Sequence, residues 1–156
     1  MLRTAESRKK SNITSYPGVI VLRNKLMKIY PLNRNYLFGK AYKNGSRASS
    51  RSLTLYVLRD KEAGKIAAGV PGGARVNRLG ISASKKIGGA VERNRAKRVI
   101  REAYRQIDRE LTLKKGWLLV ISARTPSTVL KMQEVRRDLK YCLYKADMID
   151  GEEPSR

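Results

Sequence analysis

Residues 84–105 read SKKIGGAVERNRAKRVIREAYR and combine dense positive charge with the best-defined helical pattern of the chain. From Lys85 to Arg105 the stretch holds eight lysines or arginines and two glutamates, a net charge of +6. Two glycines, Gly88 and Gly89, precede a helix predicted over residues 90–111. A helix with this charge needs an anionic partner or full solvation. The rest of the chain is therefore interpreted as the scaffold that holds this helix.

The two sides of the predicted helix differ in character. Apolar residues recur on one side at spacings of three and four, as in a helix packed against a core; they are Ala96, Val99, Ile100, Ala103, Tyr104, Ile107 and Leu111. The opposite arc of the helical wheel carries Asn94, Lys97, Arg98, Arg101 and Arg105. One side is therefore expected in the core and the other on the surface.

The composition narrows the class of partner. The 156 residues include 35 Lys and Arg against 13 Asp and Glu, a net charge of +22, while 41% of them are hydrophobic. A chain of this size can bury a core as one domain, and the charge points to nucleic acid first and to an anionic membrane second. No apolar run approaches the roughly 20 residues that span a bilayer, and no signal peptide is recognised. We therefore expect no membrane partner and a cytoplasmic location.

The chain has few residues suited to catalysis. Histidine is absent, which removes the commonest general acid or base and the commonest transition-metal ligand. Cys142 is the single cysteine, which excludes an intramolecular disulfide and a multi-cysteine zinc site. We expect it to be a small apolar residue in a helix core. No catalytic residue and no metal site are predicted in the chain.

The remaining segments predict an α/β sandwich with a mixed sheet. A short helix is expected over residues 33–42, strands over 53–58 and 79–84, a buried strand over 117–121 and a final helix over 132–146. Residues 46–52 and the glycine-rich residues 60–77 are expected to form loops. The basic residues 1–26 are interpreted as a poorly ordered extension, 27–148 as the folded domain and 149–156 as a frayed acidic tail. Fraying of the chain end is expected from residue 147 onward.

Two groups of residues are candidates for contact with a ligand. Lys85 and Lys86 precede the glycine pair at a helix N-terminus, where backbone N–H groups favour phosphate. The triplet Arg93, Asn94 and Arg95 adds two guanidinium groups and an amide, which suit a folded RNA; the alternative is a solvated basic face. The aromatic residues Phe38, Tyr42 and Tyr56 could stack on unpaired bases or belong to the core. Beside them Gly80, Ser82 and Ser84 form a small, polar side of a strand, which a ligand backbone could approach closely.

Residues 79–104 closely resemble the protein subunit of bacterial ribonuclease P. The resemblance rests on GISASKKIGGAV, residues 80–91, running into RNRAKR, residues 93–98, and IREAY, residues 100–104. It extends over roughly residues 27–146. The basic residues before Met27 and the stretch from Ala63 to Asn77, which is longer than the family's usual hairpin, depart from the family pattern.

The resemblance implies a fold and a function. The fold would be an α-β-β-β-α-β-α sandwich with a left-handed β-α-β crossover, against the usual right-handed rule. The holoenzyme would remove the 5′ leader of precursor tRNA, with catalysis and most Mg²⁺ binding in its RNA subunit. The RNA subunit would be bound by Arg93, Asn94, Arg95, Lys97, Arg98 and Arg101. The leader would be bound by Phe38, Tyr42, Tyr56, Ser82, Ser84, Lys85 and Lys86.

Two other classes of function are weighed against this one. A structural protein of the ribosome or of another RNA particle would have the same basic character, and would bind ribosomal RNA more tightly than the RNA of ribonuclease P. A nuclease acting by itself would need its own metal-binding carboxylates or a general base. The absence of histidine argues against this last class.

Overall fold

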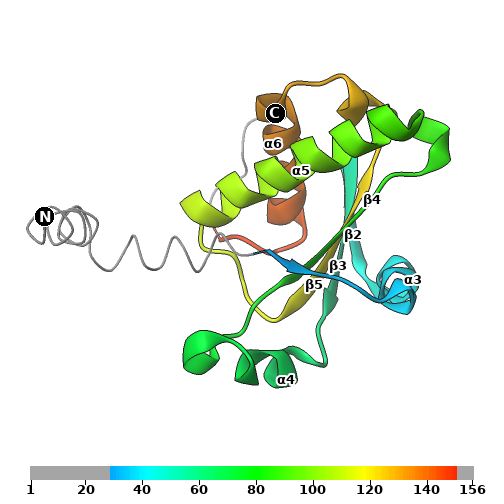
Figure 1. Cartoon of the computed structure of the whole chain (residues 1–156). Helices are drawn as coiled ribbons and strands as arrows, with labels where there is room; N and C mark the ends of the chain where they lie inside the picture. Colours follow the sequence, from blue (N-terminus) through cyan, green and yellow to red (C-terminus); the bar gives the residue numbers. More distant parts are fainter. Residues whose placement is uncertain (1–28, 151–156) are drawn as a thin grey trace, which may run out of the picture.

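The computed structural model describes residues 29–150 and contains one sheet with helices on both of its faces (Figure 1). The predicted extension and residues 151–156 of the predicted tail lie outside the described residues. The strands are β1 (Tyr30–Pro31), β2 (Ser46–Ser49), β3 (Leu53–Arg59), β4 (Arg78–Ser82) and β5 (Trp117–Ala123). The helices are α3 (Asn35–Asn44), α4 (Ala63–Ala68), α5 (Ala90–Glu110) and α6 (Met132–Lys145), with short 3-10 turns η1 (Pro71–Gly73), η2 (Lys85–Ile87) and η3 (Thr125–Thr128).

The sheet is mixed, as predicted. Its strand order is β1-β4-β5-β3-β2, in which β4 is parallel to both β1 and β5, whereas β3 is antiparallel to both β5 and β2. Strand β5 is central and almost wholly buried, which explains its continuous apolar sequence. The order from α3 to α6 follows the expected α-β-β-β-α-β-α pattern, with β1 and α4 in addition.

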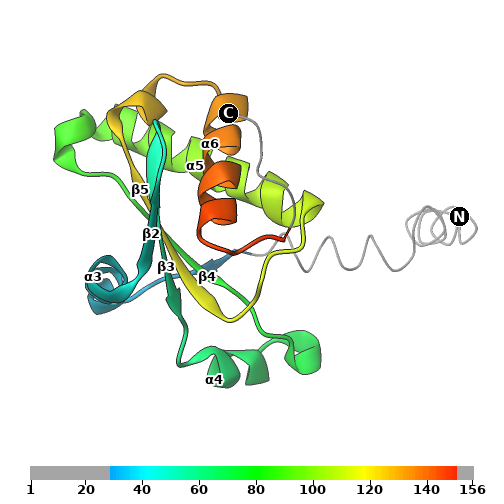
Figure 2. The ribbon, with the colours of Figure 1, turned by 180° about the vertical axis from the view of Figure 1, so that it is seen from behind.

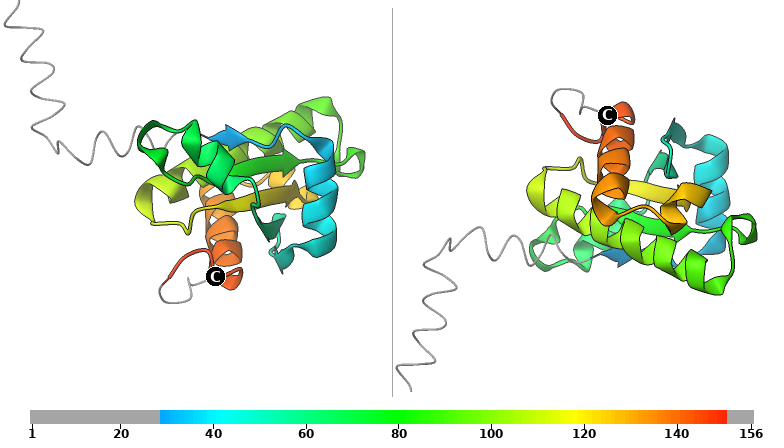
Figure 3. Two further views of the ribbon diagram at one scale, coloured as in Figure 1. Left: turned by 90° about the horizontal axis from the view of Figure 1, so that it is seen from below. Right: turned by 90° about the horizontal axis from the view of Figure 1, so that it is seen from above.

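Helix α5 connects the parallel neighbours β4 and β5. Seen from the α5 side with both strands pointing upward, β5 lies to the left of β4 (Figure 3). The crossover is therefore left-handed, as the family resemblance implied and contrary to the usual rule.

The main core lies between one face of the sheet and helices α5 and α6 (Figure 2). Ile100 and Ile107 of α5, and Leu139 and Leu143 of α6, are fully buried there. The predicted apolar side of α5 is confirmed, although Val99 and Leu111 are only partly buried. Helix α3 packs on the other face, where Leu37 and Ala41 meet Leu118 and Val120 of β5. This second face is where the aromatic candidates lie.

The prediction of a loop over residues 60–77 is wrong. The segment forms α4 and η1, and Asp60 and Asn77 at its two ends are buried. Asp60 accepts hydrogen bonds from Nε and Nη2 of Arg78 at 2.7 and 2.8 Å. Asn77 donates to the carbonyl oxygen of Lys114 at 2.8 Å and accepts from the backbone N–H of Trp117 at 3.0 Å. These polar contacts fix both ends of the segment. Because they leave no periodic pattern of apolar residues, the sequence did not predict an ordered structure here.

Two smaller predictions also need correction. Ser46–Ser49 was expected in a loop but forms β2 at the sheet edge, paired antiparallel with β3. The frayed end was expected to begin near residue 147, yet Met148 and Ile149 are buried in the main core. The backbone N–H of Met148 also donates to the carbonyl oxygen of Leu143 at 2.9 Å. The folded domain therefore extends through Ile149.

Candidate RNA interface

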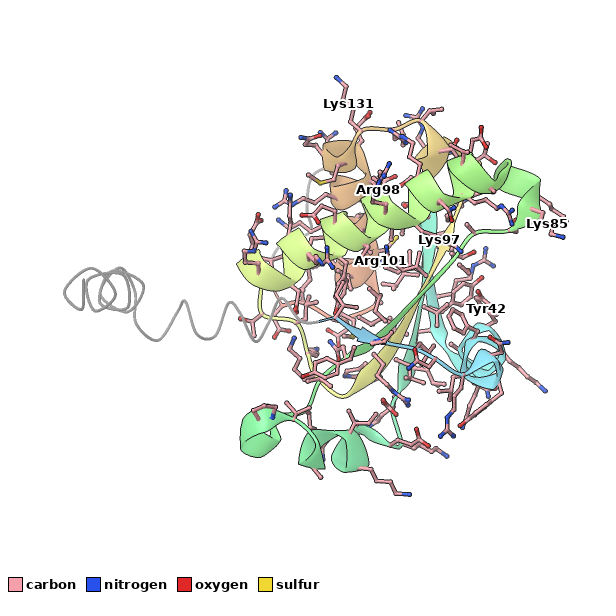
Figure 4. The ribbon with its side chains drawn as sticks, viewed as in Figure 1. Tyr42, Lys85, Lys97, Arg98, Arg101 and Lys131 are labelled. Carbon is pink, nitrogen blue, oxygen red and sulfur yellow. The ribbon has the colours of Figure 1, made fainter. Side chains whose placement is uncertain are left out.

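The outward side of α5 presents a row of cations. Lys97, Arg98 and Arg101 follow one another along the helix (Figure 4), and Asn94, Arg98 and Arg101 are exposed. Within residues 29–150, no carboxylate forms an ion pair with Lys97, Arg98 or Arg101. The ion pairs of α5 join Glu102 to Arg105, Asp108 to Lys115, and Glu110 to Arg136 of α6. Unneutralised cations on a rigid helix can contact RNA phosphates at little conformational cost.

The N-terminus of α5 differs from the predicted phosphate site. The side chain of Glu92 lies over both glycines: a Cβ built on Gly89 would come within 2.9 Å of Glu92 Oε2. Arg93 donates from Nε to the carbonyl oxygen of Gly89 at 3.3 Å. A carboxylate in the first turn stabilises the helix dipole, and it opposes a phosphate at the same place. The prediction that phosphate binds at the glycine pair is therefore not favoured by the structure.

Arg95 does not join the outward row. Its guanidinium donates to the carbonyl oxygens of Thr128 at 2.6 Å, Leu130 at 3.3 Å and Ser127 at 3.5 Å. These carbonyls belong to η3 and to the segment that leads into α6. Arg95 therefore binds the protein's own backbone, and its contact with the RNA subunit stays a prediction.

The aromatic candidates form a cleft between α3 and the second face of the sheet. Tyr42 meets Tyr56 of β3 edge to face, with ring centroids 4.9 Å apart, and its hydroxyl group lies 2.8 Å from Ser82 Oγ of β4. Phe38 lies deeper, against Gly80: a Cβ built on that glycine would be 2.5 Å from Phe38 Cζ. The close approach predicted at Gly80 is thus made by the Phe38 ring. Of the aromatic candidates Tyr42 is the most accessible, with 41% of its surface exposed.

The last three candidates continue from the end of this cleft. Ser84, Lys85 and Lys86 are exposed in and beside η2, directly after β4. Lys85 lies on the same side of the molecule as Tyr42 in Figure 4. The aromatic candidates and Ser82 thus lie in the cleft, and Ser84, Lys85 and Lys86 follow at the end of β4.

Sequence reasoning missed two residues in this cleft. Arg47 of β2 is in register with Tyr56, and Ser122 of β5 is in register with Ser82. Strand β2 has only four residues, three of them exposed and polar, so no alternation revealed it. The polar Ser122 in the apolar β5 was the one available signal that this part of the second face is open.

The described residues lack features of two other kinds of site. Residues 29–150 contain no group of three or more His, Cys, Asp or Glu side chains that could hold a metal ion. In the same range, no helix is both long enough and apolar enough to cross a membrane.

Comparison with known protein families shows which family the chain belongs to. A family model described as Ribonuclease P matches residues 26–147. The chain belongs to the ribonuclease P protein family. The ribonuclease P protein component of Clostridium kluyveri is 34% identical over 122 residues, which cover 78% of this chain and 98% of that protein. The component of Shouchella clausii is 31% identical over 118 residues, covering 76% and 86% of the two chains.

Solved structures of ribonuclease P proteins agree with the fold. The Staphylococcus aureus protein superimposes with a TM-score of 0.61 at 28% identity, covering 79% of this chain and all of that one. The Thermotoga maritima protein gives a TM-score of 0.55 at 23% identity, covering 80% and 99%, and supports the fold alone. The resemblance found in the sequence is thereby confirmed as family membership.

Proposed function

We propose that this chain is the RNA-binding component of a ribonuclease P holoenzyme that removes the 5′ leader from precursor tRNA. The observation that carries the proposal is one rigid scaffold bearing two different RNA-competent surfaces: the unneutralised cationic row of α5 and the aromatic cleft under α3. Family membership indicates the enzyme, ribonuclease P, in which the protein acts together with an RNA subunit.

The outward row of α5 binds the RNA subunit in this proposal. Lys97, Arg98 and Arg101 contact phosphates, and Asn94 supplies an amide for a base edge or a ribose hydroxyl group. Arg93, at the start of the same helix, has Nε committed to Gly89 but retains its terminal nitrogens as donors. The row lies on one continuous helix whose opposite face is buried in the core, which suits contact with a folded RNA surface.

The cleft binds the single-stranded leader. Tyr42 and Tyr56 offer ring surface for stacking, which is worth about 1–3 kcal/mol per base and tolerates any sequence. The hydroxyl group of Ser82, already bonded to Tyr42, adds a polar contact, and Lys85 and Lys86 provide charge at the end of the cleft. Phe38 supports the cleft from below because its ring packs on Gly80.

The catalytic Mg²⁺ is held by the RNA subunit in this proposal. The described part of the chain supplies no carboxylate cluster for it. The protein instead neutralises phosphates with its excess of positive charge, which lowers the repulsion between leader and RNA subunit and raises the effective affinity for Mg²⁺.

Reconstitution with a bacterial ribonuclease P RNA tests the proposal. Cleavage of precursor tRNA is measured at low Mg²⁺ and moderate salt, with a leader of several nucleotides and with a one-nucleotide leader. We expect the protein to increase cleavage and to strengthen binding of the longer-leader substrate selectively. The proposal fails if added protein changes neither rate nor affinity, if a ribosomal RNA fragment binds far more tightly than the ribonuclease P RNA, or if the protein alone cleaves.

A further inference from the structure

A basic hollow lies at the end of the sheet, beyond the aromatic cleft. Its volume is about 500 Å³, and it opens to solvent between the β2–β3 turn, η2 and the segment after β5. It is lined by Arg51, Ser84, Lys86, Ile87, Ala123, Arg124, Thr125 and Pro126. These residues come from three separate parts of the chain. Ser84 and Lys86 were already leader-binding candidates from the sequence, whereas Arg51 and Arg124 were not.

The charge of the hollow is positive and uncompensated. Arg51, Lys86 and Arg124 line it and no carboxylate does. Within residues 29–150 none of these three cations forms an ion pair with an acidic side chain. Arg124 uses Nη1 to bond the carbonyl oxygen of Ser50 at 2.6 Å. The remaining guanidinium and ammonium donors, with the hydroxyl groups of Ser84 and Thr125, match the acceptor oxygens of phosphate.

The walls of the hollow are held in place by hydrogen bonds. The backbone N–H of Arg124 donates to the carbonyl oxygen of Ser52 at 2.9 Å, which ties the segment after β5 to the β2–β3 turn. The buried hydroxyl group of Ser127 donates to the carbonyl oxygen of Arg124 at 2.6 Å. Arg95 of α5 then fixes the following carbonyls, those of Thr128 and Leu130. The cations are thus mounted on a preorganised frame, which lowers the entropic cost of binding.

The hollow continues the cleft. Ser82 and Ser122 are paired neighbours on the cleft face of the sheet, and Ser84 and Arg124 follow each of them by two residues. A strand of RNA lying over Tyr42 and Ser82 that runs past the end of β4 therefore reaches the hollow next. Ile87, Ala123 and Pro126 form the apolar part of its lining, and its three cations, with no carboxylate among the lining residues, suit a phosphate backbone.

We propose that this hollow binds phosphate groups of the precursor tRNA leader, with Arg51, Lys86 and Arg124 as the contacting residues. The inference rests on the proposed function, because it assigns a second contact to the same leader. It extends the leader path beyond the aromatic cleft to the β2–β3 turn and to the segment after β5. Neither region carries a residue that the sequence had marked for RNA.

The test uses the reconstituted holoenzyme with Arg51→Gln, Lys86→Gln and the double variant. Both side chains are exposed and make no ion pair within the described residues, so the fold is expected to persist. Lys65→Gln is the matched control, since Lys65 is an exposed cation on α4, at the opposite end of the sheet (Figure 1). Affinity is measured for precursor tRNA with a leader of several nucleotides and with a one-nucleotide leader, and separately for the RNA subunit.

We expect the double variant to bind the longer-leader substrate roughly tenfold more weakly, the scale of lost charge-assisted hydrogen bonds. The slope of log binding constant against log salt concentration should become smaller by about 0.7 for each phosphate contact with the single-stranded leader that is lost. Binding of the one-nucleotide-leader substrate and of the RNA subunit should match that of Lys65→Gln.

Two results would overturn the inference while leaving the proposed function intact. An equal loss with both leaders, or weaker binding of the RNA subunit, would place the hollow against the RNA subunit. If the double variant bound the longer-leader substrate with unchanged affinity, Arg51 and Lys86 would be solvent-exposed cations that do not contact RNA. Failure of the proposed function would be seen differently: the unaltered protein itself would show no preference for the longer leader.

Discussion

The guanidinium of Arg95 lies 2.6 Å from the main-chain carbonyl oxygen of Thr128, across the gap between α5 and η3. Two further carbonyls, those of Ser127 and Leu130, accept from the same group. The two arginines of the Arg-Asn-Arg triplet thus differ in surroundings. Arg93 lies at the start of α5, whereas Arg95 holds the backbone that follows Thr125 and Pro126 of the basic hollow.

Replacing Arg95 with alanine should destabilise the fold without changing the electrostatics of RNA binding. Loss of these charge-assisted bonds is expected to lower the free energy of unfolding by about 2–3 kcal/mol, measured by urea denaturation. Because no phosphate contact is lost, the salt slope of RNA-subunit binding should stay constant. Arg98→Ala is the control, with the reverse pattern: nearly unchanged stability and a slope smaller by about one unit. A reduced salt slope in Arg95→Ala would instead show that Arg95 contacts a phosphate of the RNA subunit.

The ion pair between Asp60 and Arg78 offers a second test. The Asp60 side chain is 1% exposed and accepts two hydrogen bonds from Arg78, whereas Glu62, bonded to the same guanidinium at 3.1 Å, is 42% exposed. Burial lowers the pKa of Arg78, and the bonds to Asp60 and Glu62 more than offset this, so its pKa is raised overall. Arg78 therefore stays charged and needs its buried partner.

Asp60→Asn should consequently cost about 3–5 kcal/mol of unfolding free energy, since Arg78 loses its buried counterion and keeps only the more exposed Glu62. Glu62→Gln, at the exposed partner, should cost under about 1 kcal/mol. Urea denaturation of both variants measures the difference. Equal and small losses would show that α4 is attached by other contacts.

The sequence was most informative where periodicity decides structure. Helix α5 was predicted to within one residue, and its buried and outward sides followed from spacings of three and four. The left-handed crossover could not be derived from any local pattern, because handedness is a property of how β4, α5 and β5 pack; family resemblance supplied it.

The failures share a physical cause. The glycine-rich segment 60–77 is ordered by long-range polar bonds, Asp60 to Arg78 and Asn77 to Lys114, which leave no period in the sequence. A helical wheel shows the direction of a side chain but not its partner, so the hydrogen bonds of Arg95 to carbonyls within residues 127–130 could not be predicted. The basic hollow brings together Arg51, Lys86 and Arg124, whose proximity only the sheet topology creates.

Cys142 should be unreactive in the native protein. It is fully buried in α6, and burial raises the pKa of its thiol to about 11, from an ordinary value of 9. Labelling by a thiol reagent at pH 8 should therefore proceed at the rate of unfolding, and urea should accelerate it strongly. Rapid stoichiometric labelling without denaturant would contradict this burial.

The raised pKa also fixes the sign of a pH dependence. Between about pH 9 and 11 the folded chain retains the thiol proton that the unfolded chain releases. The contribution of this protonated thiol to stability is complete below pH 9 and is lost as the pH rises through 11. The difference in unfolding free energy between the unaltered protein and Cys142→Ala should therefore shrink across this interval. A constant difference would mean that the thiol does not titrate differently in the two states.

Gly80 and Phe38 give a test that separates cleft geometry from overall charge. A Cβ at residue 80 would lie 2.5 Å from Phe38 Cζ and 3.1 Å from Leu32 Cδ2, so Gly80→Ala must displace the ring that supports the cleft. We expect a loss of about 1–3 kcal/mol in unfolding free energy and weaker binding of precursor tRNA with the longer leader. Binding of the RNA subunit should not change, since α5 lies on the other face of the sheet.

The double variant Phe38→Leu with Gly80→Ala supplies the control. The smaller side chain makes room for the new methyl group, so the double variant should be more stable than the sum of the two single effects predicts. Because Tyr42 and Tyr56 are retained, leader binding should recover along with stability if the ring serves mainly as support. If stability recovers while leader binding does not, Phe38 itself contacts RNA, and its place is among the stacking residues rather than beneath them.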